Sequence, residues 1–178
     1  MKETINKSNI ANMAMSVRKK QKVLTLIAIF ALFMVVATTT SCNGSTTYNH
    51  YEAIKESSWN SGDTLTFNIP PQQQGSYALT LGIRATQNYP YKQLVVIMQS
   101  TVFPSRLTRK DTIRCNIADD NGNMTGNNGI SSTDYLFHIS NENLHTGDSL
   151  SIKIHHCMKP DNLAGLTDMG IRLSRNQR

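Results

Sequence analysis

The sequence predicts an all-β fold, a single antiparallel β-sandwich of about seven or more strands with immunoglobulin-like or jelly-roll-like topology. The first observation is a hydrophobic period of two, which recurs in short runs between residues 65 and 173 and is typical of half-buried strands. The second is that polar turn signals separate these runs. The third is that no run beyond the leader shows convincing helical periodicity over about 11 residues.

The first two expected strands each bury one face. In residues 65–69 the side chains of Leu65, Phe67 and Ile69 alternate with polar neighbours, and two prolines end the run. In residues 77–83 every second side chain is apolar, which gives the clearest strand face of the chain.

The next two strands frame a turn. Residues 94–98 (LVVIM) are apolar on both faces, which predicts a central strand. A second strand, with Ile113, Cys115 and Ile117 on one face, leads into the turn cluster DDNGN at residues 119–123, where Asn-Gly favours a hairpin.

Alternation predicts three more strands, which complete the sandwich. Their apolar positions are Tyr135, Phe137 and Ile139, then Leu150, Ile152 and Ile154, and finally Met169, Ile171 and Leu173.

A targeting segment precedes the expected domain. The basic run RKKQK at residues 18–22 is followed by residues 23–37, an apolar run of fifteen residues interrupted only by Thr25. That length suits a signal peptide, because crossing a bilayer takes about 20 apolar residues. We therefore expect a signal peptide over residues 1–41, a tether over residues 42–58 and the sandwich over residues 59–178.

Cys42 follows the apolar run and the small residues TTTS, which resembles the lipobox of bacterial lipoproteins. Cleavage before Cys42 and acylation by chains such as palmitate would then anchor the mature chain to a membrane. The alternative is an ordinary secretory leader with an incidental cysteine.

The charge distribution excludes a nucleic-acid binder. Residues 1–42 hold six Lys/Arg and one acid, so twelve basic and eleven acidic residues remain after Cys42, a net charge of about +1. The mature part has one basic cluster, for which a solvated strand edge competes with contact to anionic lipid or an acidic partner: Arg106, Arg109, Lys110 and Arg114.

No catalytic constellation is found. His155 and His156 are adjacent in an expected strand and would point to opposite faces. Asp119, Asn121 and Asn123 alternate as calcium ligands do, but the glycine and glutamate of an EF-hand loop are missing. We expect no catalytic residue, no metal site and no cofactor.

The other two cysteines, Cys115 and Cys157, are expected to be buried or half-buried free thiols. An oxidising compartment would also permit a disulfide between them.

Four stretches together carry a family resemblance. They are WNSGDTLTFNI with Trp59, Asp63 and Phe67; YALTLGIRATQNYPYKQL with Arg84, Tyr89-Pro90-Tyr91 and Leu94; Asp111-Thr112 followed by Gly122, Gly126 and Gly129; and HHCMKPDNLAGLTDMGIRL with Met158, Leu163, Gly165, Asp168 and Gly170. The chain resembles the GldH family of gliding-motility lipoproteins over nearly all of its mature part.

The resemblance implies a non-enzymatic outer-membrane lipoprotein, accessory to the gliding apparatus and its linked type 9 secretion machinery. Its partners would be other envelope lipoproteins or proteins of the secretion complex. Acidic residues often follow the lipid cysteine of surface-exported relatives, whereas the first acid here is Glu52, so we expect the periplasmic side of the outer membrane.

Tyr89-Pro90-Tyr91 predicts a turn between two strands, and an aromatic residue before proline favours a cis bond. We expect Arg84 to stack on these rings or to donate to the turn carbonyls. Because tyrosine, tryptophan and arginine are enriched at interface hot spots, the candidate docking residues are Arg84, Tyr89, Pro90, Tyr91 and Trp59.

Two other functions stay open at this point. One is a lipid-anchored carbohydrate- or ligand-binding module that uses Trp59 and the Tyr89/Tyr91 loop, although Trp59 is also expected to cap one end of the sandwich. The other is a hydrolase built around His155 or His156.

Overall fold

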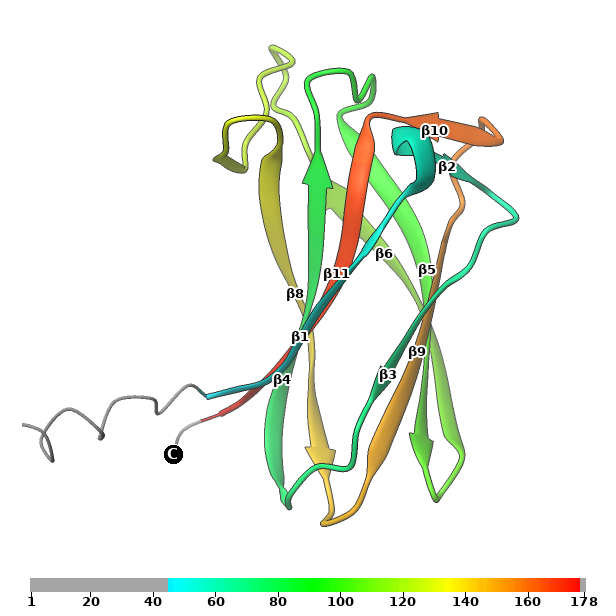
Figure 1. The fold of residues 1–178 in the computed structure, drawn as a ribbon, viewed down its shortest axis with the longest axis vertical. Helices are drawn as coiled ribbons and strands as arrows, with labels where there is room; N and C mark the ends of the chain where they lie inside the picture. The colour runs from blue at the N-terminus through cyan, green and yellow to red at the C-terminus, as the bar shows by residue number, and fades with distance from the viewer. Residues whose placement is uncertain (1–44, 177–178) are drawn as a thin grey trace, which may run out of the picture. The chain divides into compact units, whose positions relative to one another are not determined.

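The computed structural model describes residues 45–176, which form the predicted antiparallel β-sandwich (Figure 1). Two sheets face each other across one hydrophobic core, and a small third sheet lies at one end. Within the described residues no helix is both long and apolar enough to cross a membrane.

The first layer is a five-stranded sheet in which all neighbours are antiparallel. Its strands in spatial order are β1 (Thr46–Ala53), β11 (Leu166–Arg175), β4 (Gly75–Ala85), β8 (Thr133–Leu144) and β7 (Asn127–Asn128).

The second layer is a four-stranded antiparallel sheet. Its strands are β3 (Leu65–Ile69), β9 (Ser149–His156), β5 (Gln93–Phe103) and β6 (Leu107–Asn116). The small sheet pairs β10 (Asn162–Ala164) with β2 (Ser58–Asn60), next to the 3-10 turn η1 (Lys55–Ser57).

The alternating apolar residues of the sequence form the core. On β4 the inward positions are all but inaccessible, from Tyr77 at 1% exposed to Ala85 at 0%. The other strands add the same pattern, with these fully buried members: Phe67, Leu94, Met98, Cys115, Ile152, Ile154, Met169, Ile171 and Leu173.

Residues 46–53 differ from the sequence expectation, because they form strand β1 and not a tether. β1 pairs with the edge of β11 from Thr46 to Ala53, so the sandwich begins thirteen positions before Trp59. The segment carries few aliphatic residues, but its backbone completes the β11 edge and its Tyr48 packs against the core. Residues 54–58 of the expected tether are structured as well, as the buried Ile54, η1 and the first residue of β2. The leader and Cys42 lie outside the described residues.

β5 occupies the interior position that its sequence predicts, between β9 and β6. Only one of its faces is fully buried, however. Val95 and Ile97, on the other face, are half exposed because no further layer covers that side of the four-stranded sheet.

Candidate functional site

The β4–β5 loop presents only part of the Tyr89-Pro90-Tyr91 motif to solvent. Tyr89 is 8% exposed, and its hydroxyl donates to the carbonyl of Gln93 over 2.9 Å. Burial raises the pKa of Tyr89 well above its ordinary value, so this phenol stays a neutral donor. Pro90 and Tyr91, by contrast, are exposed, Tyr91 to 38%.

The Tyr89–Pro90 bond, which the sequence suggested could be cis, is not the cis bond of the structure. Among the described residues the cis peptide is Phe103–Pro104, at the tip of the β5–β6 hairpin.

Arg84 stacks on the ring of Tyr51 and not, as expected, on the rings of Tyr89 and Tyr91. Its guanidinium carbon lies 4.3 Å from the ring centroid of Tyr51, on the outer face of the five-stranded sheet. Two carboxylates flank the same guanidinium, Asp134 at 3.1 Å and Asp168 at 3.9 Å. We call these four residues the Arg84 cluster.

Glycines explain why Tyr51 reaches Arg84. Tyr51 pairs with Gly170 on β11, which in turn pairs with Gly82 on β4. A Cβ built on Gly170 would lie 2.6 Å from the Tyr51 ring, and one on Gly82 would overlap the same ring. The two missing side chains therefore leave a flat strip on which the ring lies, and burial raises the pKa of Tyr51 there.

Trp59 is buried, which differs from its expected place on a docking surface. It is 1% exposed, its indole N–H donates to the carbonyl of Asp63 over 3.1 Å, and its ring meets His156 edge-on at 5.3 Å between centroids. Trp59 sits in the small sheet at one end of the sandwich, so its indole stabilises the core and offers no surface to a partner.

The two adjacent histidines diverge as expected for a strand. His156 is 2% exposed and its Nε2 lies 3.0 Å from the Trp59 carbonyl, whereas His155 lies on the outer face of β9. His138 is on the outer face of the other sheet, paired with Thr80. The structure therefore brings none of the three histidines together.

The loop at residues 119–123 is a hairpin turn. The Asp119 carboxylate accepts the backbone N–H groups of Asn121 and Asn123 at 2.9 and 2.8 Å. A further hydrogen bond from the Asn123 amide, with these backbone donors, lowers the pKa of Asp119. No group of three or more metal-ligating side chains occurs in residues 45–176.

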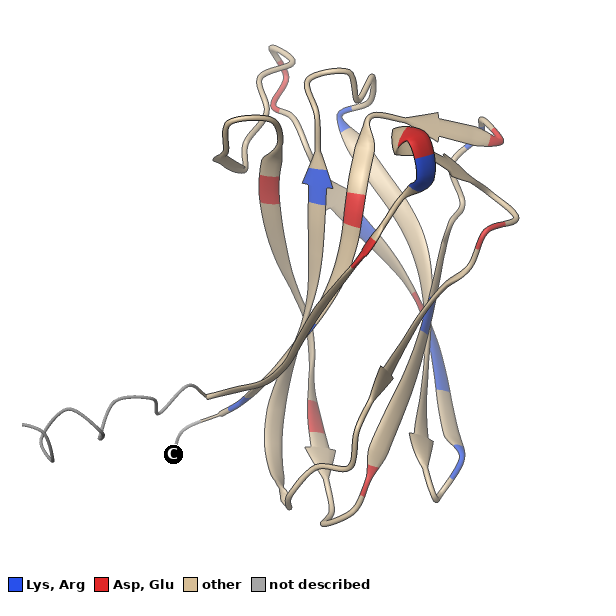
Figure 2. Ribbon diagram, viewed as in Figure 1, with Lys and Arg blue, Asp and Glu red and all other residues tan. Residues whose placement is uncertain are grey.

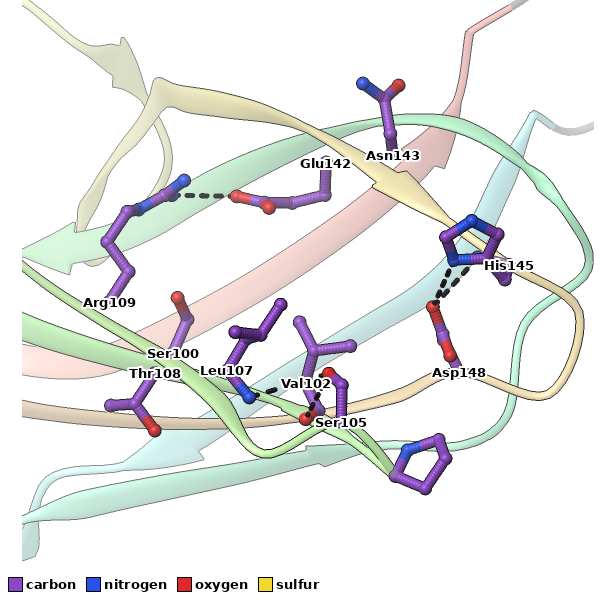
Figure 3. A pocket seen from close by; sticks show the side chains of 11 residues that line it. Ser100, Val102, Ser105, Leu107, Thr108, Arg109, Glu142, Asn143, His145 and Asp148 are labelled. Carbon is purple, nitrogen blue, oxygen red and sulfur yellow. Dashed lines mark hydrogen bonds and ion pairs between the residues drawn. The ribbon is translucent and has the colours of Figure 1, made fainter.

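A cleft that the sequence did not predict opens between the free edges of the two sheets, where β6 and β8 face each other (Figure 3). Its volume is about 500 Å³, within the range of small-molecule sites. Its lining combines apolar side chains with hydroxyl, amide, imidazole and ion-paired groups. The lining residues are Val102, Pro104 and Leu107; Ser100, Ser105 and Thr108; Asn143 and His145; and Arg109, Glu142 and Asp148.

Arg109 closes one end of this cleft and ties the two sheets together. Its guanidinium lies 2.8 Å from Glu142 on β8 (Figure 3). It also lies 2.7 Å from Asp111 on its own strand. The hydrogen bond to Asp111 raises the pKa of Arg109. Since both carboxylates already neutralise this cation, the cleft offers polar hydrogen-bonding groups but no free positive charge to an anionic ligand.

The two described cysteines are both free thiols, as expected, but only one is buried. Cys115 is 0% exposed and Cys157 is exposed, because β9 ends at His156 and Cys157 lies beyond it. Burial raises the pKa of Cys115 from its ordinary value of 9.0 to about 12.

The family model described as GldH lipoprotein matches residues 46–173, which is the whole sandwich from β1 to β11. The chain belongs to the GldH lipoprotein family. The GldH match begins at the first residue of β1, so the family domain includes the strand that the sequence pattern had assigned to the tether.

Two curated relatives agree with this assignment. The chain is 24% identical to the gliding motility lipoprotein GldH of Flavobacterium johnsoniae, over 89% of this chain and 98% of the relative. It is 23% identical to a GldH homolog of Christiangramia forsetii, over 84% and 96%. GldH proteins are therefore gliding-motility lipoproteins of nearly the same length as this chain.

Among solved structures, part of a 4-O-methyl-α-glucuronidase with specificity for decorated arabinogalactans matches with a TM-score of 0.43 and 13% identity. The match covers 78% of this chain and 18% of that one.

Proposed function

We propose that this GldH-family protein is a non-enzymatic component of a gliding-motility and type 9 secretion-linked envelope complex, lipid-anchored to the periplasmic side of the outer membrane through Cys42. The observation that carries the proposal is the family match across the entire sandwich. The leader pattern supports the anchor, because Cys42 follows a signal-like apolar run and the small residues at 38–41.

The docking surface for partner proteins is the end of the sandwich formed by the β4–β5 loop. Tyr91 and Pro90 are exposed there, and the Arg84 cluster lies at the same end, since Arg84 is the penultimate residue of β4. Tyrosine and arginine on a rigid strand end suit an interface hot spot. β1 begins at the other end of the five-stranded sheet from this surface (Figure 1).

In-cell crosslinking followed by identification of co-purified proteins tests this docking surface. Tyr91→Ala should lose envelope partners while the protein stays folded, with only a small drop in melting temperature from the lost edge-on contact between the Tyr91 and Tyr89 rings, 5.8 Å between centroids. His138→Ala, which removes an exposed ring in the middle of β8, is the matched control and should keep the partners. Full partner recovery with Tyr91→Ala would contradict the docking assignment.

A separate experiment tests the periplasmic location of the domain. Protease added to intact cells should leave the sandwich uncut, and permeabilised cells should lose it. Removal of the domain from intact cells would place it on the cell surface instead.

A carbohydrate-binding module remains the alternative function. The aromatic platform expected for it needs Trp59, Tyr89 and Tyr91 together, and of these only Tyr91 is exposed. The structure thus favours protein docking over a stacking platform at this end of the sandwich.

A further inference from the structure

The outer face of the four-stranded sheet carries only positive charges. Strand pairing places Lys110 opposite Gln99, and Gln99 opposite Lys153, so both lysines point outward in one row. Arg114, four residues beyond Lys110, lies on the same face, and Arg106 extends from the hairpin turn. We call these four residues the basic face.

No acidic side chain interrupts the basic face within the described chain. The one acid on the four strands, Asp111, alternates to the opposite side and pairs with Arg109. In residues 45–176 none of the four basic side chains has a carboxylate within ion-pair distance, and all four are exposed. In Figure 2 the blue bands of Lys and Arg recur along β6 and its hairpin.

An apolar tip borders the basic face. Phe103 is 40% exposed and Leu107 is 71% exposed, at the two strand ends that flank the β5–β6 turn. Exposed apolar side chains next to unpaired cations match the two layers of a lipid surface, where phosphates lie above acyl chains.

β1 begins at the hairpin end of the sandwich. In the sequence, Cys42 stands four residues before Thr46, the first residue of β1. Strand pairing places Thr46 with Ser174 and Ala78, at the end of the sandwich that also holds the β5–β6 hairpin (Figure 1).

We propose that the basic face and the Phe103/Leu107 hairpin tip bind the anionic phospholipid surface to which the chain is anchored. This inference rests on the lipid anchor of the proposed function. The bound bilayer holds the domain in one orientation and leaves the Arg84 cluster, on the outer face of the other sheet, free for protein partners. Each cation near an anionic surface strengthens the contact roughly fivefold, so the four together favour a single bound pose.

Depth-dependent quenching tests the pose on the full mature lipoprotein reconstituted into vesicles. A bimane probe is attached to the cysteine introduced by Ser105→Cys, in a variant that also carries Cys157→Ser. Among the described residues, the other thiol of this variant is then Cys115, which is buried. The control probe is at Asn88→Cys, an exposed loop residue at the opposite end. With phosphatidylglycerol in the vesicles, doxyl-labelled lipid should quench the Ser105 probe at least threefold more strongly than the Asn88 probe.

Two comparisons test whether electrostatic attraction causes the stronger quenching of the Ser105 probe. The Ser105 signal should fall to the control level in neutral phosphatidylcholine vesicles, and again when Lys110→Glu and Lys153→Glu are combined, with thermal melting showing that the double variant is folded. Both lysines are exposed, so the reversal leaves the core unchanged.

The outcomes separate the two proposals. Protein that floats with anionic vesicles but shows equal quenching at both probes overturns the membrane pose and leaves the anchor intact. Equal quenching in neutral and anionic vesicles also overturns it, since charge then plays no part. Protein that does not float with any vesicle overturns both the anchor and the pose.

Discussion

Gly165 shows how one residue fixes the candidate docking loop. It adopts φ +86°, and a Cβ there would lie 2.6 Å from the Cα of Tyr89 and closer still to its nitrogen. The Gly165 carbonyl also accepts the N–H of Thr86 at 2.8 Å. Because only glycine permits both this dihedral angle and this approach, Gly165 holds the start of the β4–β5 loop against the β10–β11 turn.

Gly165→Ala should therefore lower the free energy of unfolding by about 2–4 kcal/mol, from left-handed strain and from overlap with backbone that cannot move aside. Gly147→Ala is the matched control, since Gly147 has φ +92° but no atom within 4 Å of its Cβ position. It should cost only about 1–2 kcal/mol. Urea melts of both variants measure the difference, and equal losses would show that the close approach to Tyr89 contributes nothing.

The two free thiols should differ in reactivity. At neutral pH a thiol reagent should modify Cys157 in the folded chain and reach Cys115 only after unfolding, because Cys115 is fully buried with its pKa raised to about 12. Mass spectrometry of peptides after brief labelling identifies the modified residue. Rapid labelling of Cys115 in the folded protein would contradict its burial.

The burial of Cys115 also predicts that the free energy of unfolding depends on pH. The pKa of Cys115 is raised in the folded state above its ordinary value of 9.0, so its contribution to stability is fully present below pH 9. It is lost as pH rises from 9 towards 12, because the unfolded thiol ionises first. Cys115→Ala should flatten this part of the stability profile, and an unchanged alkaline slope in the variant would contradict the assignment.

At the scale of elements, β1 is the first strand of the fold and forms one edge of the five-stranded sheet. Its backbone pairs with β11 along its whole length, and Tyr51 lies across two further strands. β1 is thus held by its edge pairing and by two tyrosine rings, Tyr48 against the core and Tyr51 on the outer face, with little aliphatic burial of its own.

Hydrogen exchange tests whether β1 is part of the sandwich. Amides of β1 that bond to β11 should exchange more slowly than amides of the exposed β4–β5 loop by at least tenfold, because they open only with the sheet edge. Tyr51→Ala should speed this exchange more than His138→Ala does. Exchange of all β1 amides at the rate of an unstructured chain would restore the tether interpretation.

Alternation predicted the strands that bury one face, such as β4 with Leu79, Leu81 and Ile83, because each carries its own periodic signal. It could not predict β1, because the glycines that support Tyr51 are far away in the chain. Gly170 on β11 lies more than a hundred residues from Tyr51, and Gly82 on β4 lies about thirty residues from it. The three-residue strands β2 and β10 are too short to show a period at all.

The candidate site was less predictable than the fold, for the same reason. Tyr89 and Tyr91 look alike in sequence, but only the loop conformation decides that one is buried and the other exposed. The cleft depends on Arg109 and Glu142, which lie on different sheets and meet only when the sandwich closes. Local patterns carry no information about such contacts.

At the scale of the whole molecule, the sandwich has two different ends. The hairpin end carries the apolar Phe103/Leu107 tip and the start of β1, and the loop end carries Tyr91 and the Arg84 cluster. The basic face runs along the four-stranded sheet between the two ends, since Arg114 pairs with Val95 near the loop end of β5. In the two proposals above, the membrane contacts and the Arg84 cluster lie on opposite outer faces of the sandwich, so both can be occupied together.

The most direct test of this account is mass spectrometry of the N-terminal peptide of the mature protein isolated from cell membranes. The account predicts a chain that begins at Cys42, with a diacylglyceryl group on the thiol and an acyl chain on the amino group. Cys42→Ser should release the protein from the membrane fraction. A mature chain that begins elsewhere, or one that begins at Cys42 with an unmodified thiol, would contradict the lipid anchor on which both proposals rest.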